Sequence, residues 1–374
     1  MSQLNKYLPL ALIVVFPLGQ LSSIPLLPTP IKIYYHDLII LLLLIFNVKT
    51  VITIFKTNTP LIGFTSLGLF SLLLNMQIGL LPIILSSLYL ARLIAYLTII
   101  HLLPELITLK QARPYILLTI ITTILLGIAQ YLLIPLLEPL FILGWDRHAY
   151  RLVGTHLDPN FTGLLYTLAL IWIINHLLKH HKHPYIHWTT TLGLIVVIML
   201  TYSRSTYLAL VTSTTWILKH KVTPKIIATS VILFIIALLL LPQRFGEGTK
   251  LLRTSTINAR ISNWQDALQL IQQKPLFGHG FNTLKYIQPN AQHNTTRSNS
   301  QSGYDNGILT LLATVGIFGT MQFLWFIANL ISSSPNKKLI TASLIAIFTH
   351  TMFLNSLLYP WTLLWISFIN IKDK

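Results

Sequence analysis

Arginine and lysine occupy different parts of this sequence, and the arginines are the residues best suited to bind an anion. Most lysines fall in short breaks between apolar runs, together with only one of the nine arginines, Arg113. Arg92 lies inside a run, and the other seven lie at or beyond the opposite ends of the runs: Arg147, Arg151, Arg204, Arg244, Arg253, Arg260 and Arg297. A guanidinium presents a planar fork of donors that matches phosphate or carboxylate, so the pattern predicts an anion site. Contact with lipid head groups, or pairing with Asp146 and Glu247, is the alternative.

Two acidic residues stand where a long apolar run begins. Asp305 follows Gly303-Tyr304, and Asp158 is followed by Pro159 and Asn160. Aspartate is a favoured helix N-cap and suits the positive end of a helix, and proline is common at the first helical position. Each residue can therefore be a cap, a site residue or both, and Asp305 is the key candidate acid.

One run of histidines looks like a metal motif but fits a solvated basic loop better. It comprises His180, His181 and His183 beside Lys182, with His176 and His187 nearby. The run lacks acidic partners and a zinc-enzyme spacing. The chain has no cysteine, which excludes disulfides and thiolate metal sites, and it contains no phosphate-binding glycine motif. We therefore predict no metal site and no cofactor.

The composition requires that lipid, rather than water, surrounds most of the chain. Of the 374 residues, 53% are hydrophobic and 9% are charged, with a mean hydropathy of +0.68, whereas soluble domains carry about 25% charged residues. The net charge of +17 comes largely from lysines where topology determinants sit, so nucleic acid is not an expected partner. A charge within a span is costly unless it faces protein or a water cavity, and Glu105 or a lipid phosphate is the expected partner of Arg92.

Apolar runs long enough to span a bilayer recur about twelve times. They cover residues 7–24, 33–48, 59–76, 79–103, 114–136, 160–178, 186–203, 205–218, 226–242, 304–331, 339–356 and 358–371. Backbone groups in lipid must be hydrogen-bonded internally, so every run is predicted to be a helix, the first being a retained span rather than a signal peptide. The predicted fold is all-α: a polytopic membrane protein with one integral membrane domain over residues 1–374 and a turn at Ser203–Arg204–Ser205.

The lysine-bearing breaks are predicted to face the cytoplasm by the positive-inside rule. They include both termini, with Lys6 and Lys372. The segment 137–159 and the long loop 243–303 then face outward, and this loop is too long to be a mere connector. We expect the loop to carry part of the functional site. Its polar stretch from Gln288 to Ser302 is predicted to be mobile or to bind sugar hydroxyls.

A helix is predicted inside the outer loop. Its apolar stripe consists of Trp264, Ala267, Leu268 and Ile271, at the spacing i, i+3, i+4 and i+7 of one helical face. Asn258 or Ser262 is expected to cap it, and Lys274-Pro275 to end it. Such an amphipathic helix lies on a membrane surface and would hold Arg260 at the interface.

Four segments occur in a characteristic order. They read RLVGTHLDPNFTG at 151–163, LTYSRSTYLAL at 200–210, ARISNWQDALQLIQQKPLFGHGF at 259–281 and YDNGILTLLATVGIFG at 304–319. The shared elements are Gly-Thr-x-x-Asp-Pro-Asn before a span, Ser-Arg at an outer helix end, Arg-x-x-x-Trp leading to Pro-Leu-x-Gly-x-Gly, and a span that opens with a short motif and carries Gly-x-x-Gly. This order, the number of spans and the place of the outer loop resemble the O-antigen ligase and polymerase superfamily of bacterial envelope glycosyltransferases.

The resemblance implies a GT-C-like helical membrane enzyme that works without a metal. It would move a glycan from undecaprenyl diphosphate to a hydroxyl of a lipid, glycan or protein acceptor, on the outer face of the bacterial inner membrane. The family arginines that hold the diphosphate correspond to Arg204 and Arg260, with Arg151 as a further candidate, and they would stabilise the charge that develops on the leaving group. Further substrate contacts are expected from Asp158, Asn160, Trp264, His279, His293 and Asn306.

One position departs from the family pattern. Members usually carry His-Asn at the start of this span, with the histidine as the proposed base, whereas this chain has Asp305-Asn306. The spacing to Gly316 and Gly319 aligns Asp305 with that histidine, and a carboxylate can accept a proton from an attacking hydroxyl. The change can also mark another acceptor or an inactive chain, and His293 is a second candidate base.

Two other classes of function stay open. A transporter or flippase for lipid-linked sugars would carry charged residues deep in several spans and an internal repeat, but the sequence has mainly Arg92 and no repeat. A non-catalytic envelope scaffold is the second alternative, because Asp305 replaces the family base. Ligases and polymerases share these motifs and differ in their acceptor, so the sequence does not separate them.

Overall fold

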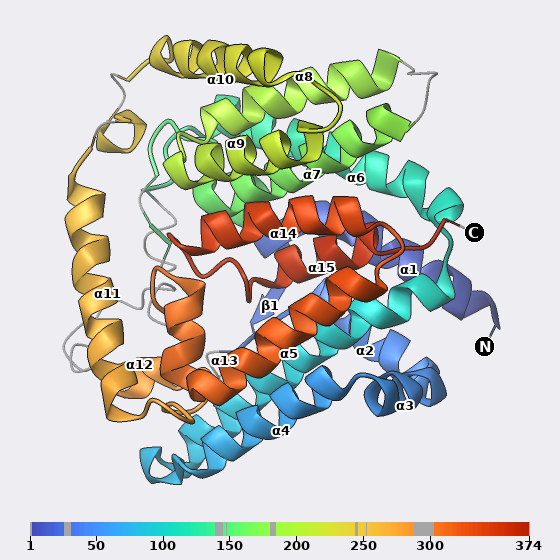
Figure 1. Cartoon of the computed structure of the whole chain (residues 1–374), viewed down its shortest axis with the longest axis vertical. Coiled ribbons are helices and arrows are strands. Elements are labelled where there is room, and N and C mark those ends of the chain that lie inside the picture. The colour runs from blue at the N-terminus through green and yellow to red at the C-terminus, as the bar shows by residue number, and fades with distance from the viewer. Residues whose placement is uncertain are drawn as a thin grey trace.

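The computed structural model of the chain describes residues 2–25, 31–138, 145–146, 148–179, 185–243, 246–251, 253–287 and 303–373. Within these ranges the fold is helical, with one two-stranded antiparallel ribbon (Figure 1). The α-helices are α1 (Ser2–Val15), α2 (Tyr35–Phe46), α3 (Val48–Thr57), α4 (Thr59–Leu73), α5 (Leu80–Leu106), α6 (Leu109–Leu133), α7 (Pro159–Lys179), α8 (Tyr185–Leu200), α9 (Arg204–Leu218), α10 (Pro224–Leu239), α11 (Ser255–Gln273), α12 (Leu284–Ile287), α13 (Gly307–Ser333), α14 (Lys337–Thr351) and α15 (Pro360–Ile369). The strands are β1 (Ser23–Pro25) and β2 (Lys32–Tyr34), with Ser23 opposite Tyr34.

The helical prediction is confirmed, because each predicted apolar run contains a helix in the described part of the chain. The predicted turn is also present: α8 ends at Leu200, and Ser203 caps α9 by accepting a hydrogen bond from the backbone of Thr206. Two run ends differ from the prediction at the ribbon. The run expected to reach residue 24 finishes in strand β1. The run expected from residue 33 starts as strand β2, and the helix begins only at Tyr35, where the Asp37 carboxylate accepts the backbone N–H of Tyr34.

The protein is a polytopic membrane protein, but its number of spans stays a prediction. In the described part, α5, α6, α7 and α13 are each long and apolar enough to cross a membrane. The helices α2 and α3 supply a fifth span if they count as one, although they are bent by 87°. Further apolar helices, α4, α8, α10 and α15, are shorter. The structure therefore supports four or five spans by length, compared with the predicted number of about twelve.

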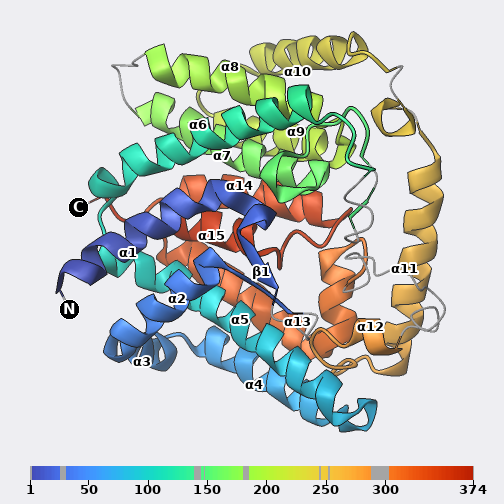
Figure 2. The same cartoon turned by 180° about the vertical axis from the view of Figure 1, so that it is seen from behind.

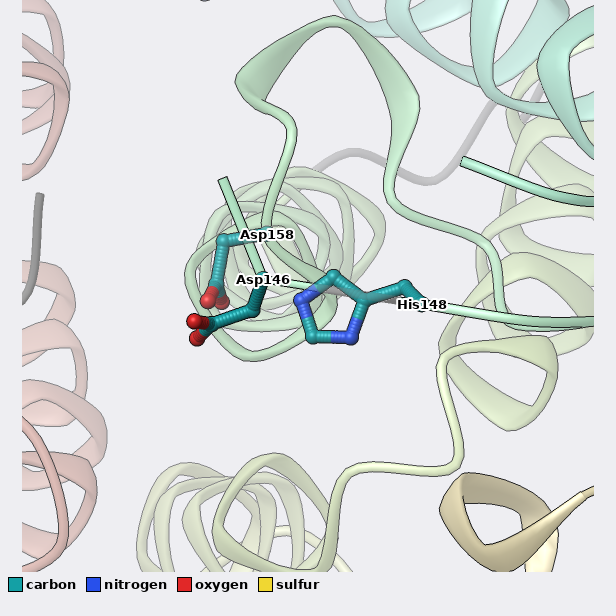
Figure 3. Close-up of side chains that lie close together, drawn as sticks. All are labelled: Asp146, His148 and Asp158. Atoms are coloured by element: carbon teal, nitrogen blue, oxygen red, sulfur yellow. The ribbon is translucent and has the colours of Figure 1, made fainter. Parts of the chain in front are cut away.

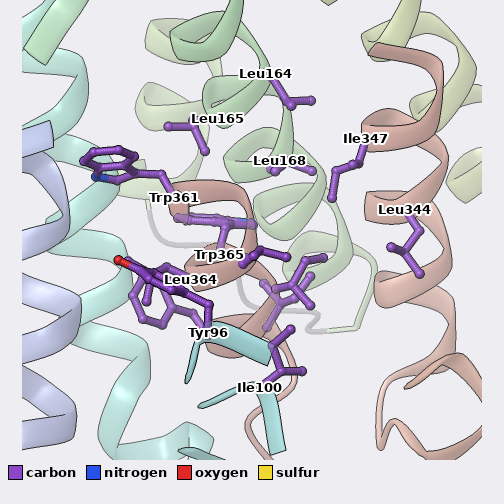
Figure 4. Close-up of a cluster of buried hydrophobic side chains, with 14 of the residues drawn as sticks. Tyr96, Ile100, Leu164, Leu165, Leu168, Leu344, Ile347, Trp361, Leu364 and Trp365 are labelled. Carbon is purple, nitrogen blue, oxygen red and sulfur yellow. The ribbon is translucent and has the colours of Figure 1, made fainter. Parts of the chain in front are cut away.

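Helix α15 forms the centre of the main hydrophobic core. Trp361, Leu364 and Trp365 of this helix are at most 2% exposed. They pack among Tyr96 and Ile100 of α5, Leu164, Leu165 and Leu168 of α7, and Leu344 and Ile347 of α14 (Figure 4). A ten-residue helix that is apolar on all sides is stable only when neighbours surround it. This packing fixes the start of α15 beside the start of α7.

Helix α11 runs along one side of the molecule, across the direction of the bundle helices, and both chain termini lie at the opposite side (Figures 1 and 2). The helix starts at Ser255, earlier than the predicted caps Asn258 and Ser262, and it ends before Lys274 as predicted. Trp264, Ala267 and Ile271 face inward, but Leu268 is 49% exposed, and Leu270 packs in its place. Ile257 and Ile261 are exposed like Leu268, so the helix also has an apolar side that faces outward.

The loop after α11 is joined to a break in α13. The N–H groups of His279 and Gly280 donate to the carbonyls of Ala313 and Thr314, and the N–H of Ile317 donates to the carbonyl of Pro275, over 2.8–2.9 Å. Gly316 interrupts α13 with φ +66°, and a Cβ there would lie 2.3 Å from the Leu276 carbonyl oxygen. Glycine is required because only it tolerates both this φ and this approach. The loop thereby fixes α11 against α13.

Candidate functional site

A cavity of about 580 Å³ lies between β2, α5, α11 and the starts of α7, α13 and α15. Of the predicted site residues, it is lined by Asp158, Asn160, Arg260 and Asp305. Five other described candidates do not line it: Arg151, Arg204, Trp264, His279 and Asn306. His293 lies outside the described residues. Arg147, Arg244 and Arg297 lie outside them as well.

Asp305 does not cap the helix that follows it. The N-cap of α13 is Asn306, whose side-chain oxygen accepts the backbone N–H groups of Ile308 and Leu309 over 2.9 and 3.1 Å. The interpretation of Asp305 as a cap is therefore wrong, since its neighbour satisfies the helix end. The Asp305 carboxyl is left to face the cavity.

The backbone of Asp305 is held by α11. Its N–H donates to the side-chain oxygen of Asn263 over 2.7 Å, and its carbonyl accepts the indole N–H of Trp264 over 3.3 Å. Asn263 and Trp264 lie three and four residues after Arg260, so all three share one face of the helix. The helix that carries the candidate cation therefore also positions the candidate acid.

Arg260 and Asp305 influence each other electrostatically across the cavity. Burial raises the pKa of the Asp305 carboxyl; Arg260 opposes this rise, while Asp146 and Asp158 add to it. Burial lowers the pKa of Arg260, and Asp305 partly offsets this change. None of the ion pairs among the described residues joins the two. The Arg260 guanidinium lies 5.6 Å from the centre of the Phe353 ring and remains able to bind an anion.

Asp158 is the cap of α7, as predicted. Its carboxylate accepts the backbone N–H groups of Asn160 and Phe161 over 2.7 and 2.9 Å. Asn160 in turn accepts the hydroxyl of Ser203 over 2.8 Å, which ties the start of α7 to the start of α9. Burial raises the pKa of Asp158, although the two backbone donors oppose this. Both residues also line the cavity, so the capping role does not remove them from the site.

Arg151 and Arg204 bind backbone carbonyls next to the cavity. The buried Arg151 donates to the carbonyls of Thr201 and Tyr202 over 2.9 and 3.4 Å, between α8 and α9. Burial, with Arg253 nearby, lowers the pKa of Arg151 to about 10. Arg204 donates to the carbonyls of Leu251 and Arg253 over 3.3 and 3.0 Å. Arg204 thus holds the segment that leads into α11, while Arg260 is the predicted arginine that reaches the cavity.

His279 makes a contact within the protein, and Arg92 has a partner other than the residue predicted. A ring nitrogen of the buried His279 contacts the Leu270 carbonyl over 2.9 Å, so this residue joins the loop to α11. Arg92 pairs with Asp37 over 2.9 Å, and its expected partner Glu105 pairs instead with Lys372. The predicted partner was wrong because β2 brings the start of α2 beside α5. The two histidines that flank the predicted basic loop are less solvated than predicted, since His187 is buried and stacks on His176. The run His180–His183 itself lies outside the described residues.

The structure also brings together three residues that the sequence did not group. Asp146, His148 and Asp158 have ligand atoms that all lie within 4.8 Å of one another, and the two carboxylates lie next to each other on one side of the imidazole (Figure 3). Such a set can hold a divalent cation. Burial lowers the pKa of His148 to about 4, and Arg151 and Arg253 act in the same direction, so nearby positive charge opposes cation binding. The only local signal was the Asp-x-His spacing at 146–148, and Asp158 joins it through the fold.

The family comparison matches the segment from α8 to α13. The family model described as O-antigen ligase covers residues 189–324. The chain carries an O-antigen ligase domain. This domain contains Arg204, Arg260 and Asp305, whereas Arg151, Asp158 and Asn160 precede it. The predicted resemblance is thereby confirmed, and no curated protein matches the chain significantly.

Proposed function

We propose that this protein is a glycosyltransferase that moves a glycan from undecaprenyl diphosphate to an acceptor hydroxyl. The observation that carries the proposal is the placement of Arg260 and Asp305 of the O-antigen ligase domain on one cavity. Family membership supports glycan transfer of the ligase or polymerase type. We further propose that the reaction takes place on the outer face of the bacterial inner membrane, where the loop 243–303 would lie.

In the proposed reaction, the acceptor oxygen attacks the anomeric carbon and the bond from this carbon to the diphosphate oxygen breaks. Asp305 accepts the proton of the attacking hydroxyl, and undecaprenyl diphosphate leaves with the bonding electron pair. Arg260 stabilises the negative charge that develops on the diphosphate, because a cation that is already held in position needs no reorganisation during the reaction. Attack opposite the leaving group inverts the configuration of the anomeric carbon.

The remaining candidates have positioning roles in this proposal. Arg204 holds the segment before α11, and Trp264 holds the Asp305 carbonyl. Asn306 caps the start of α13, so the Asp305 carboxyl is not needed for that role. Arg151 orders the turn between α8 and α9. These contacts set the separation between the proposed base and the proposed anion-binding group.

The test uses purified protein in lipid vesicles, with a synthetic undecaprenyl-diphosphate oligosaccharide as donor and a panel of lipid, glycan and protein acceptors. We expect a glycosylated product with inverted configuration, and its identity separates ligase from polymerase. Arg260→Ala should abolish transfer, and Arg113→Ala serves as the control because Arg113 pairs with Asp373, away from the cavity. Normal transfer by Arg260→Ala would refute the assignment of the diphosphate site.

The same vesicles distinguish the alternative functions. A flippase would move the donor from one leaflet of the vesicle to the other without consuming it. A labelled donor and a reagent that cannot cross the membrane would reveal this movement. A non-catalytic scaffold would do neither. The enzyme proposal requires that product formation depends on both Arg260 and Asp305.

A further inference from the structure

We propose that one wall of the cavity is a subsite for an acidic sugar of the transferred glycan, such as one bearing a carboxylate. We call this wall the lysine–tyrosine wall; it consists of Lys32, Tyr34, Tyr89, Arg92 and Lys285, all of which line the cavity. The inference rests on the proposed function, because it names the substrate class of the same site.

The wall is assembled from β2, α5 and α12, and α12 carries Lys285. Lys32 and Tyr34 occupy alternate positions of β2 and so point to the same side of the ribbon. Tyr89 and Arg92 are three residues apart on α5, on one helical face. The Arg92 guanidinium lies 5.0 Å from the centre of the Tyr34 ring, and the Lys285 ammonium lies 5.5 Å from the centre of the Tyr89 ring. These contacts join Arg92 to Tyr34 and Lys285 to Tyr89, and all five residues line the same cavity.

The wall carries a surplus of positive charge. Arg92 is neutralised by Asp37, but no ion pair among the described residues involves Lys32 or Lys285. None of the nine acidic residues of the chain falls in 26–30 or 288–302, the segments next to these lysines that lie outside the described ranges. Burial lowers the pKa of both lysines. An anionic ligand would therefore stabilise the half-buried ammonium groups of Lys32 and Lys285, because a buried charge is costly unless it is paired.

Unpartnered polar atoms beside the wall indicate a ligand with hydroxyl groups. His156 is 1% exposed and lines the cavity, and neither of its ring nitrogens has a hydrogen-bond partner among the described residues. The indole N–H of Trp361, also on the lining, likewise lacks a partner there. The two ring nitrogens of an imidazole can donate and accept hydrogen bonds. Sugar hydroxyls can both donate and accept.

The aromatic rings favour a sugar over a free inorganic anion. The Lys32 ammonium lies 5.3 Å from the centre of the Trp145 ring, and the ring of Tyr89, which like Trp145 is partly exposed, also lines the cavity. Ligand sites typically combine apolar, aromatic walls with a few polar groups that fix orientation. The C–H face of a sugar ring packs on such aromatic faces while its acidic group reaches an ammonium. The diphosphate of the donor is the other anion that these lysines can bind, and the experiment separates the two.

The experiment compares two undecaprenyl-diphosphate oligosaccharides that differ only in one sugar, which is glucose in one donor and glucuronic acid in the other. The acidic sugar is placed in turn at each of the first three positions. We expect the protein in vesicles to show a higher kcat/KM for at least one acidic donor, by about 10- to 100-fold for one or two charge-assisted hydrogen bonds. Lys32→Met and Lys285→Met should each reduce this preference about tenfold or more, and Lys32→Arg should retain it.

The matched control is Lys219→Met. Lys219 also lies over an aromatic ring, 5.0 Å from the centre of Trp216, but it does not line the cavity. This variant should keep the preference of the wild type. Equal losses for acidic and neutral donors in Lys32→Met and Lys285→Met would place the diphosphate at the lysines and overturn the inference. A wild type that does not prefer any acidic donor would also overturn it.

Binding of the free oligosaccharides provides a readout that does not need transfer. Titration calorimetry should give a lower Kd for the acidic oligosaccharide, and Lys285→Met should remove the difference. Selective binding without any transfer would refute the proposed enzymatic function and leave the subsite standing. Transfer without selectivity for the acidic sugar would refute the subsite and leave the proposed enzymatic function standing.

Discussion

Replacement of Asp305 by asparagine removes one charge and leaves the local structure intact. The backbone of Asp305 is held by Asn263 and Trp264, and the cap of α13 is Asn306, so the carboxylate carries none of these contacts. The loss of general base catalysis typically costs about 100- to 10,000-fold in rate, or about 3–5 kcal/mol of transition-state stabilisation. We therefore expect Asp305→Asn to lose transfer by this factor while its unfolding temperature stays unchanged.

Asn306→Ala is the matched control, because it alters the cap and keeps the carboxylate. It should lower the unfolding temperature, since a lost N-cap costs about 1 kcal/mol, and it should reduce transfer far less than Asp305→Asn. Initial rates with the labelled donor, together with thermal unfolding of the same detergent-solubilised samples, provide both values. Transfer within a factor of a few of wild type in Asp305→Asn would refute the assignment of Asp305 as the base.

The pH dependence follows from the sign of the pKa shift. A base must be deprotonated, and the pKa of Asp305 is raised mainly by burial. Transfer should therefore fall as the pH drops through a value above the ordinary aspartate pKa of about 3.9. An active Asp305→His variant should move this fall towards the ordinary histidine value of about 6.5. Binding of the anionic donor disfavours the ionised carboxylate further, so the fall in kcat should lie at a higher pH than the fall in kcat/KM.

Three further predictions concern the surroundings of the site. Gly316→Ala should strongly destabilise the protein and abolish transfer, because a Cβ there would lie 2.3 Å from the Leu276 carbonyl oxygen; thermal unfolding checks this, and Gly193→Ala, which meets no atom closer than 3.7 Å, should be tolerated. Arg204→Ala should lower kcat at least tenfold, since each lost hydrogen bond from a charged donor costs about 1.5–3 kcal/mol; a rate equal to that of wild type would refute its positioning role. Treatment with EDTA should leave transfer unchanged, because guanidiniums lie near the Asp146–His148–Asp158 group; restoration of a lost rate by Mg²⁺ would instead identify that group as a metal site.

The helices were predictable because lipid leaves little choice of backbone structure. A run of apolar residues in a bilayer must satisfy its hydrogen bonds internally, so hydropathy alone located helices such as α5 and α13. The strand β2 escaped this reasoning, since Ile33 and Tyr34 belong to an apolar run but pair with β1. The failure matters for function, because this ribbon presents Lys32 and Tyr34 to the cavity.

The site was less predictable because its parts come from distant segments. In Asp305-Asn306 two good capping residues are adjacent, and local propensity cannot decide which one caps. The decision is made by α11, which fixes the Asp305 backbone from Asn263 and Trp264. The same limit applies to Asp146 and His148, which meet Asp158 only through the fold.

The glycine spacing near residues 278 and 316 has a physical reason that the sequence alone did not reveal. Gly278 and Gly316 have φ of +67° and +66°, and each meets the backbone of the other segment at a distance that excludes a Cβ. This close approach joins the end of α11 to the middle of α13, while Asn263 and Trp264 join α11 to the residue just before α13 starts. The two helices are thus connected at two levels, and neither can slide along the other without breaking one set of contacts. Because Arg260 lies on α11 and Asp305 directly precedes α13, this double connection fixes the distance between the proposed cation and the proposed base before any substrate binds.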